Sequence, residues 1–133
     1  MEKNRSLFMS GWFAIGLLAF VPKNSSQEPW NVPDAAKNKA NPLKGNAESV
    51  ATGKALYNQH CKSCHGAKGK GDGPKAATLD TDCGDFTKAS FKSQTDGALF
   101  YKTSEGRKDM PSYKKKIADP NDIWAVVNYM RTL

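Results

Sequence analysis

An all-α domain of three to five short helices is the fold that this sequence predicts. Two stretches, residues 47–60 and 119–133, carry apolar side chains at the three- and four-residue spacing of a helix with one buried face. A shorter helix is expected from about Thr95 to Ser104. No stretch alternates apolar and polar side chains convincingly over the length of a strand, and no segment repeats.

Local signals support the two longer helices and the loop between them. Asn46 is a suitable N-cap for the first helix, and Asp119 caps the last, with Pro120 at its first helical position. Gly53 lies inside the first helix, where glycine costs about 1 kcal/mol relative to alanine. The close approach of a second backbone is a reason to accept that cost. Residues 66–73 are rich in Gly and Lys and predict a loop.

Residues 1–26 have the three-part layout of a secretory signal peptide. A positively charged start is followed by an apolar run over residues 7–21 and a polar stretch that ends in small residues. No A-x-A cleavage site is present, and the run is shorter than the ~20 residues that cross a bilayer. A cleaved signal peptide and a short N-terminal membrane anchor, tethering the protein through residues 7–21, both remain open. Either one predicts an exported protein, periplasmic or on the outer face of the cytoplasmic membrane.

Residues 27–46 form a Pro- and Asn-rich segment without apolar periodicity, which predicts an extended arm or linker. Trp30 and Val32 are candidate anchors for this arm on the domain that follows, residues 47–133. The chain has a formal net charge of +7, and removal of residues 1–26 (three basic residues and one acidic) leaves +5. This moderate charge favours acidic protein surfaces or an anionic membrane face as partners. No nucleic-acid-binding module is recognisable, and we expect a monomer.

The most informative motif is Cys61-Lys62-Ser63-Cys64-His65. Two thiols three residues apart lie on nearly one face of a helical turn, where they can add to the two vinyl groups of one haem. His65 then supplies an imidazole nitrogen to the iron. The C-x-x-C-H spacing is the attachment signature of a c-type haem.

Two other chemistries use closely spaced cysteines. A thioredoxin-like dithiol requires a strand that leads into the motif, whereas a helical segment precedes Cys61. A zinc site could combine Cys61, Cys64 and Cys83 with a histidine, but no second pair of ligands follows. If the haem uses two thiols, Cys83 is left as a small buried apolar residue or as the partner in an intermolecular disulfide.

The second axial position of the iron has few candidate ligands. His60 adjoins Cys61 on the wrong side, and Met130 lies on the apolar stripe of the last helix. Met110 lies in a polar segment before Pro111, which forces it toward an extended conformation. A methionine in a polar loop has no packing reason to be there, so Met110 is the predicted thioether ligand.

From Ala47 to Leu133 the chain resembles the class I cytochromes c, in particular small exported monohaem cytochromes of bacteria. The resemblance rests on C-x-x-C-H after the first helix, on Gly71-Asp72-Gly73-Pro74, on Asp109-Met110-Pro111-Ser112 and on the aromatic-bearing last helix. It implies the class I cytochrome c fold around one covalently attached haem c. It also implies that the carbonyl of Pro74 accepts a hydrogen bond from the second ring nitrogen of His65 and orients that ligand.

These residues predict a one-electron carrier. With His65 and Met110 both bound, the iron has no open position for a substrate, and no Ser-His-Asp set, carboxylate pair or phosphate loop suggests an enzyme. We expect a carrier in an exported, periplasmic respiratory chain, with redox proteins as partners. Candidate lysines for docking acidic partners are Lys62, Lys108 and residues 114–116. Two alternatives are a haem-bearing subunit or domain of a larger membrane oxidoreductase complex, and a ligand-binding haem protein with a labile Met110.

Overall fold

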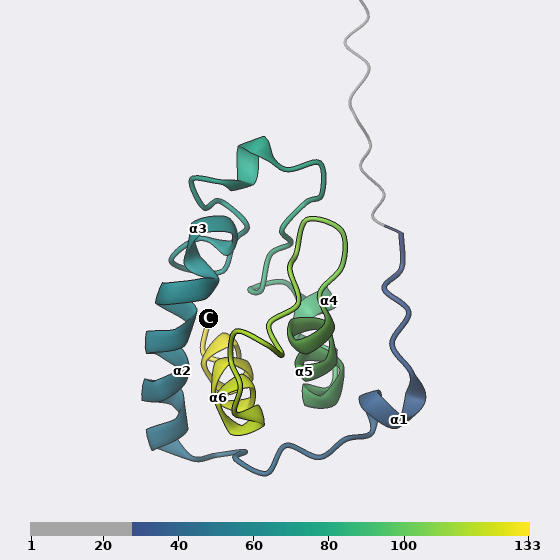
Figure 1. Cartoon of the computed structure of the whole chain (residues 1–133), viewed down its shortest axis with the longest axis vertical. Coiled ribbons are helices and arrows are strands. Elements are labelled where there is room, and N and C mark those ends of the chain that lie inside the picture. Colours follow the sequence, from purple (N-terminus) through teal and green to yellow (C-terminus); the bar gives the residue numbers. More distant parts are fainter. Residues whose placement is uncertain (1–27) are drawn as a thin grey trace, which may run out of the picture.

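A computed structural model describes residues 28–133, so the predicted signal peptide or anchor lies outside the described residues. The helices, in chain order, are α1 (Asp34–Lys37), α2 (Ala47–His60), α3 (Lys62–His65), α4 (Ala89–Lys92), α5 (Asp96–Glu105) and α6 (Pro120–Met130), with a 3₁₀ turn, η1 (Ala76–Thr78), between α3 and α4 (Figure 1). The described residues contain no strand, only an isolated bridge between Arg107 and Met110. The predicted all-α class is confirmed. None of the helices in residues 28–133 is long and apolar enough to cross a membrane.

The number of helices is larger than predicted because three of the six are single turns. α1, α3 and α4 have four residues each, whereas α2, α5 and α6 have 14, 10 and 11. Such short turns carry too few residues to show a helical period in the sequence. The caps of the long helices follow the sequence: Asn46 accepts a hydrogen bond from the Ser49 N–H at 3.1 Å, and Asp119 accepts one from the Asn121 N–H at 2.8 Å.

The centre of the fold is the crossing of α2 and α6, which lie side by side in Figure 1. A Cβ atom at Gly53 would overlap the backbone carbonyl of Ala125 on α6. One turn further along α2, Tyr57 is fully buried and its ring makes an edge contact with Tyr129, at 5.2 Å between centroids. Val126 is also fully buried. The glycine in the helix interior therefore has the predicted reason: its missing side chain lets the two helices touch.

The segment before α2, residues 28–46, packs against α5 and is called the arm below. It contains α1, a turn that lies within the segment predicted to be extended. The Thr95 hydroxyl donates to the Lys37 carbonyl at 2.7 Å, and a Cβ atom at Gly97 would overlap the Ala36 carbonyl. Val32 is only 4% exposed. The arm is thus held against the helical body by both apolar and polar contacts.

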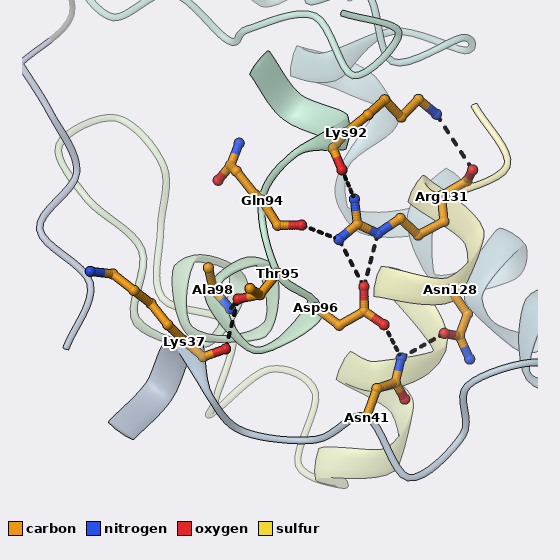
Figure 2. A network of polar contacts seen from close by, with 9 residues as sticks. All are labelled: Lys37, Asn41, Lys92, Gln94, Thr95, Asp96, Ala98, Asn128 and Arg131. Carbon is orange, nitrogen blue, oxygen red and sulfur yellow. Dashed lines mark hydrogen bonds and ion pairs between the residues drawn. The ribbon is translucent and has the colours of Figure 1, made fainter. Parts of the chain in front are cut away.

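A polar network ties the arm to the ends of α5 and α6 (Figure 2). The Asp96 carboxylate accepts hydrogen bonds from Asn41 Nδ2 at 3.0 Å and from Arg131 Nε at 2.9 Å. Asn41 Nδ2 also donates to Asn128 Oδ1 at 2.8 Å. Partial burial raises the pKa of Asp96, but the hydrogen bonds from Asn41 and Arg131 and the charge of Arg131 outweigh it, so the net pKa is lowered. The carboxylate is therefore ionised at neutral pH and is a stable acceptor for both donors.

Candidate functional site

A cavity of ≈ 310 Å³ opens between α3, the loop over residues 79–86, α5 and the loop that carries Met110. Its size falls in the range of cofactor sites in proteins, about 300–1,000 Å³. Four of the five residues predicted for the site line this cavity: Cys61, Cys64, His65 and Met110. The fifth, Pro74, is exposed and lies outside it.

The end of α2 positions the two thiols and the imidazole. α2 ends at His60, and Cys61 is its C-cap, with its N–H donating to the Tyr57 carbonyl at 2.8 Å. The chain continues at once into α3, where the His65 N–H donates to the Cys61 carbonyl at 2.9 Å. One continuous helical path therefore directs residues 61, 64 and 65 toward the same cavity, as the spacing predicts.

The glycine-rich loop after α3 folds back against it. The Gly71 N–H donates to the His65 carbonyl at 2.9 Å, and the Gly73 N–H donates to the Cys64 carbonyl at 3.1 Å. A Cβ atom at Gly73 would overlap the Ser63 carbonyl, which only glycine avoids. The buried Tyr57 hydroxyl donates to the Gly66 carbonyl at 2.7 Å. These contacts fix the back of the site, behind His65.

The His65 ring is in the state that suits a metal ligand. Burial lowers its pKa, and the backbone of Cys83 only partly opposes this, so the imidazole is neutral at pH 7. The ring lies 4.8 Å from the Phe86 ring, centroid to centroid. Its Nδ1 atom is buried and has no hydrogen-bond partner. The contact with the Pro74 carbonyl that the resemblance implies is therefore not formed in this structure.

The environment of the thiols argues against the two alternatives. Burial, together with the charge of Cys64, raises the pKa of Cys61 to about 12. A redox-active dithiol needs the opposite shift, because its thiolate must form near neutral pH. Within residues 28–133, no group of three or more His, Cys, Asp or Glu residues is placed to hold a metal ion. The zinc alternative therefore has no ligand set in this part of the chain.

Met110 lies in a tight turn at the rim of the cavity. The backbones of Arg107 and Met110 exchange two hydrogen bonds, at 2.8 and 2.9 Å, around Lys108, which has a φ of 53°. The neighbouring Asp109 carboxylate accepts from the Thr81 N–H at 2.9 Å and from its hydroxyl at 2.6 Å. Met130 also lines the cavity, but it is 6% exposed and belongs to the core cluster. Met110 is half-buried, so it is less enclosed by core side chains than Met130 is.

Sequence patterns did not reveal several other residues of the cavity wall. Cys83 is half-buried and lines the cavity, whereas the sequence predicts only a small buried residue or a disulfide partner at this position. Tyr113 lines it too, and its hydroxyl donates to the His60 carbonyl at 2.7 Å. Phe86 and Phe91 stack on each other, 4.4 Å between centroids. They lie outside the long helices, so no period marked them.

The donor set fits a covalently held haem. Two thiols, a neutral imidazole and a thioether border one cavity whose remaining wall includes the aromatic rings of Phe86 and Phe91. Thiols in this spacing can form thioether bonds, and imidazole and thioether are the two ligands that hold haem iron in electron-transfer cytochromes. The buried Nδ1 of His65 has no hydrogen-bond partner, so this ring atom is desolvated without a compensating hydrogen bond from the protein.

The solved structures that resemble this chain include a chain of a protein complex and a small cytochrome in two forms. A chain of the Kuenenia stuttgartiensis reducing HAO-like protein complex Kustc0457/Kustc0458 matches with a TM-score of 0.63 and 25% identity, over 80% of this chain and 51% of that one. The KustC0563 c-type cytochrome matches with a TM-score of 0.53 and 29% identity, over 60% of this chain and 94% of that one. A mutant of Kustc0563 gives a TM-score of 0.52 and 28% identity, over 60% and 95%. This chain thus spans about half the length of the HAO-like complex chain.

Among proteins with curated descriptions, none matches this chain. The family described as Cytochrome c matches residues 50–133, which is more than half of the chain and contains the C-x-x-C-H motif and Met110. The chain therefore belongs to the cytochrome c family, with the all-α fold of that family and one covalently bound haem c.

Proposed function

We propose that this protein is a one-electron carrier of an exported respiratory chain. In this proposal Cys61 and Cys64 attach the haem, and His65 and Met110 are the axial ligands of its iron. One observation carries the proposal: a single cavity of ≈ 310 Å³ is lined by both thiols, by the imidazole and by the thioether. Family membership supports haem-based electron transfer.

The residues around the cavity explain why electron transfer is favoured over catalysis. When bound, the haem supplies an iron that changes between Fe(III) and Fe(II) by one electron. Two protein ligands leave no coordination position for a substrate. Phe86, Phe91 and Leu99 are buried apolar side chains of the cavity wall. A thioether ligand and an apolar surrounding both favour Fe(II), so we expect a positive reduction potential.

Redox proteins with acidic docking surfaces are the proposed partners. Lys62 and Lys115 are exposed, and Lys62 directly follows Cys61 at the cavity. Lys108 and Lys114, which the sequence also offered, are paired with Glu28 at 2.9 Å and with Glu105 at 2.7 Å. These pairs reduce the positive charge that a partner meets on the Met110 side. The formal net charge of the whole chain, +7, still steers it toward acidic surfaces.

A second candidate is a haem-bearing subunit or domain of a larger oxidoreductase complex. The observation in its favour is the match to a chain of an HAO-like protein complex, which covers 80% of this chain. That coverage is more than residues 50–133 alone could supply, so residues before position 50 take part in the match as well. Purification of the native protein under mild conditions separates the candidates: stable partner subunits favour the complex, and an isolated monomer favours the carrier.

The first test is an absorption spectrum of the oxidised and reduced holoprotein. We expect sharp low-spin bands when reduced and the weak long-wavelength iron–sulfur charge-transfer band when oxidised. Met110→Ala should abolish the charge-transfer band and open the iron to carbon monoxide, whereas Met130→Leu, a change of similar volume in the core, should preserve the band. A high-spin parent that binds carbon monoxide rapidly would refute the carrier proposal and favour a ligand-binding haem protein.

A further inference from the structure

The arm contributes a side chain to the wall of the haem cavity. Trp30 lines the cavity together with Met110, although it precedes the segment that matches the family, residues 50–133. Two cations contact its ring: the Arg107 guanidinium carbon lies 4.5 Å from the ring centroid and the Lys102 Nζ lies 5.5 Å from it. Tryptophan is the aromatic residue that attracts cations most strongly. Burial and the charge of Arg107 lower the pKa of Lys102, so this cation is partly desolvated where it meets the ring.

The same part of the arm is tied to the turn that carries Met110. Arg107 Nη1 donates to the Glu28 carbonyl at 2.9 Å, and Lys108 Nζ pairs with the Glu28 carboxylate at 2.9 Å. The backbone of Arg107 exchanges two hydrogen bonds with Met110. Both contacts of the arm are therefore made to residues that lie within three positions of Met110 in the sequence.

The segment after Met110 is anchored to α5, where Ser112 Oγ donates to the Ser104 carbonyl at 2.7 Å, so the arm acts on the tip of the turn. Lys108 adopts a positive φ, which a side-chain-bearing residue rarely does, and both Lys108 and Asp109 are exposed. On the side away from the arm, the Asp109 carboxylate is held by Thr81. The arm, in contrast, is fixed to the body by Val32, which is buried two residues after Trp30. The tip of the turn is therefore held by the arm on one side and by the Thr81 contact on the other.

We propose that residues 28–32 act as a strap across the turn of Met110, with Trp30 as its positioning residue. The strap keeps the turn closed over the cavity and excludes water beside the sulfur. This inference rests on the proposed role of Met110 as axial ligand. It predicts that a competing ligand reaches the iron faster, and that the reduction potential falls as water enters, when the strap is weakened.

The test measures how fast added imidazole replaces the sulfur ligand in the oxidised, full-length holoprotein, followed by the loss of the iron–sulfur charge-transfer band. Trp30→Ala should speed this replacement about tenfold, the factor expected from losing two cation–π contacts. It should also lower the midpoint potential. Trp30→Phe keeps a ring for both cations and should restore most of the parent behaviour. Glu28→Gln should fall between the parent and Trp30→Ala, because the bond from Arg107 to its carbonyl remains.

Asp34→Asn is the matched control. Like Glu28→Gln, it removes one negative charge from the arm and breaks an exposed ion pair, here Asp34 with Lys37 at 3.0 Å. Unlike Glu28, Asp34 makes no hydrogen bond or ion pair with the turn that carries Met110. Equal replacement rates for Trp30→Ala and Asp34→Asn would overturn the strap while leaving the proposed function intact. A parent protein without the charge-transfer band would overturn both. If Trp30→Ala yields no folded holoprotein, the rates at which imidazole replaces the sulfur are compared between Glu28→Gln and Asp34→Asn. Equal rates in these two variants would again overturn the strap.

Discussion

The close crossing of α2 and α6 makes Gly53→Ala a decisive test of the fold. Two effects oppose each other at this position. Alanine is favoured over glycine in a helix interior by about 1 kcal/mol. Against this, the new methyl group would overlap the carbonyl of Ala125, a backbone atom that cannot rotate away. Either the two helices move apart or the contact between them is strained.

Separation of the helices also affects side chains beyond position 53. Tyr57 and Val126, both fully buried, lie on the two helices beside the crossing and lose packing if the crossing widens. Extra atoms in a packed core typically destabilise by about 1–3 kcal/mol, and an overlap with backbone belongs at the upper end. Subtracting the helix preference leaves a net loss of about 2 kcal/mol. For a domain of this size that corresponds to a fall of roughly 8 °C or more in Tm.

Denaturant unfolding of the holoprotein, followed by far-UV circular dichroism, measures this loss. Thr52→Ala is the control, because Thr52 is exposed on the same helix and the change improves helix preference without a new contact. We expect Thr52→Ala to be as stable as the parent or slightly more stable. If Gly53→Ala matched that control, the helices would not touch at Gly53, and the close packing of α2 on α6 would be wrong.

Two further predictions concern the polar network and the third cysteine. Because the folded pKa of Asp96 is lowered, its stabilising effect is complete above the unfolded pKa of about 3.9 and is lost as the pH falls through the folded value. Asp96→Asn should therefore flatten the loss of stability below that pH, relative to the parent, in acid unfolding experiments; an unchanged acid profile would show that the pair with Arg131 contributes nothing. Cys83→Ala should retain one covalent haem, measured by the intact mass, because the C-x-x-C-H motif already supplies two thiols. Cys64→Ala should retain at most one thioether bond. If Cys83→Ala lost the haem instead, the assignment of the attachment to Cys61 and Cys64 would be wrong.

The sequence predicted the parts of the fold that depend on a helical period of apolar residues or on a helix cap. The long helices, the caps at Asn46 and Asp119 and the role of Gly53 all follow from local patterns, and the structure confirms them. The short turns α1 and α4 do not, because four residues cannot express a helical period. For the arm, the local pattern identified Trp30 and Val32 as candidate anchors but did not indicate which residues they contact.

For the site, the sequence predicts roles for Cys61, Cys64, His65 and Met110 because few other residue types can attach a haem or bind its iron. The structure places all four at one cavity, and their roles stay predictions. The wall residues Phe86 and Tyr113 were not identifiable, because an aromatic residue in a loop looks the same whether it lines a cavity or covers the surface. The contact expected between Pro74 and His65 depended on a resemblance, and Nδ1 of His65 lacks that partner here.

The core and the haem cavity of this protein share their residues. Of the twelve residues in the buried core cluster, six also line the cavity: Cys61, Phe86, Phe91, Leu99, Tyr113 and Met130. A domain of this size is marginal when it must form a core from its own side chains. Filling the cavity with a large apolar group therefore completes the core as well as the redox site. We therefore expect haem attachment and folding to be coupled, because half of the core cluster also borders the cavity.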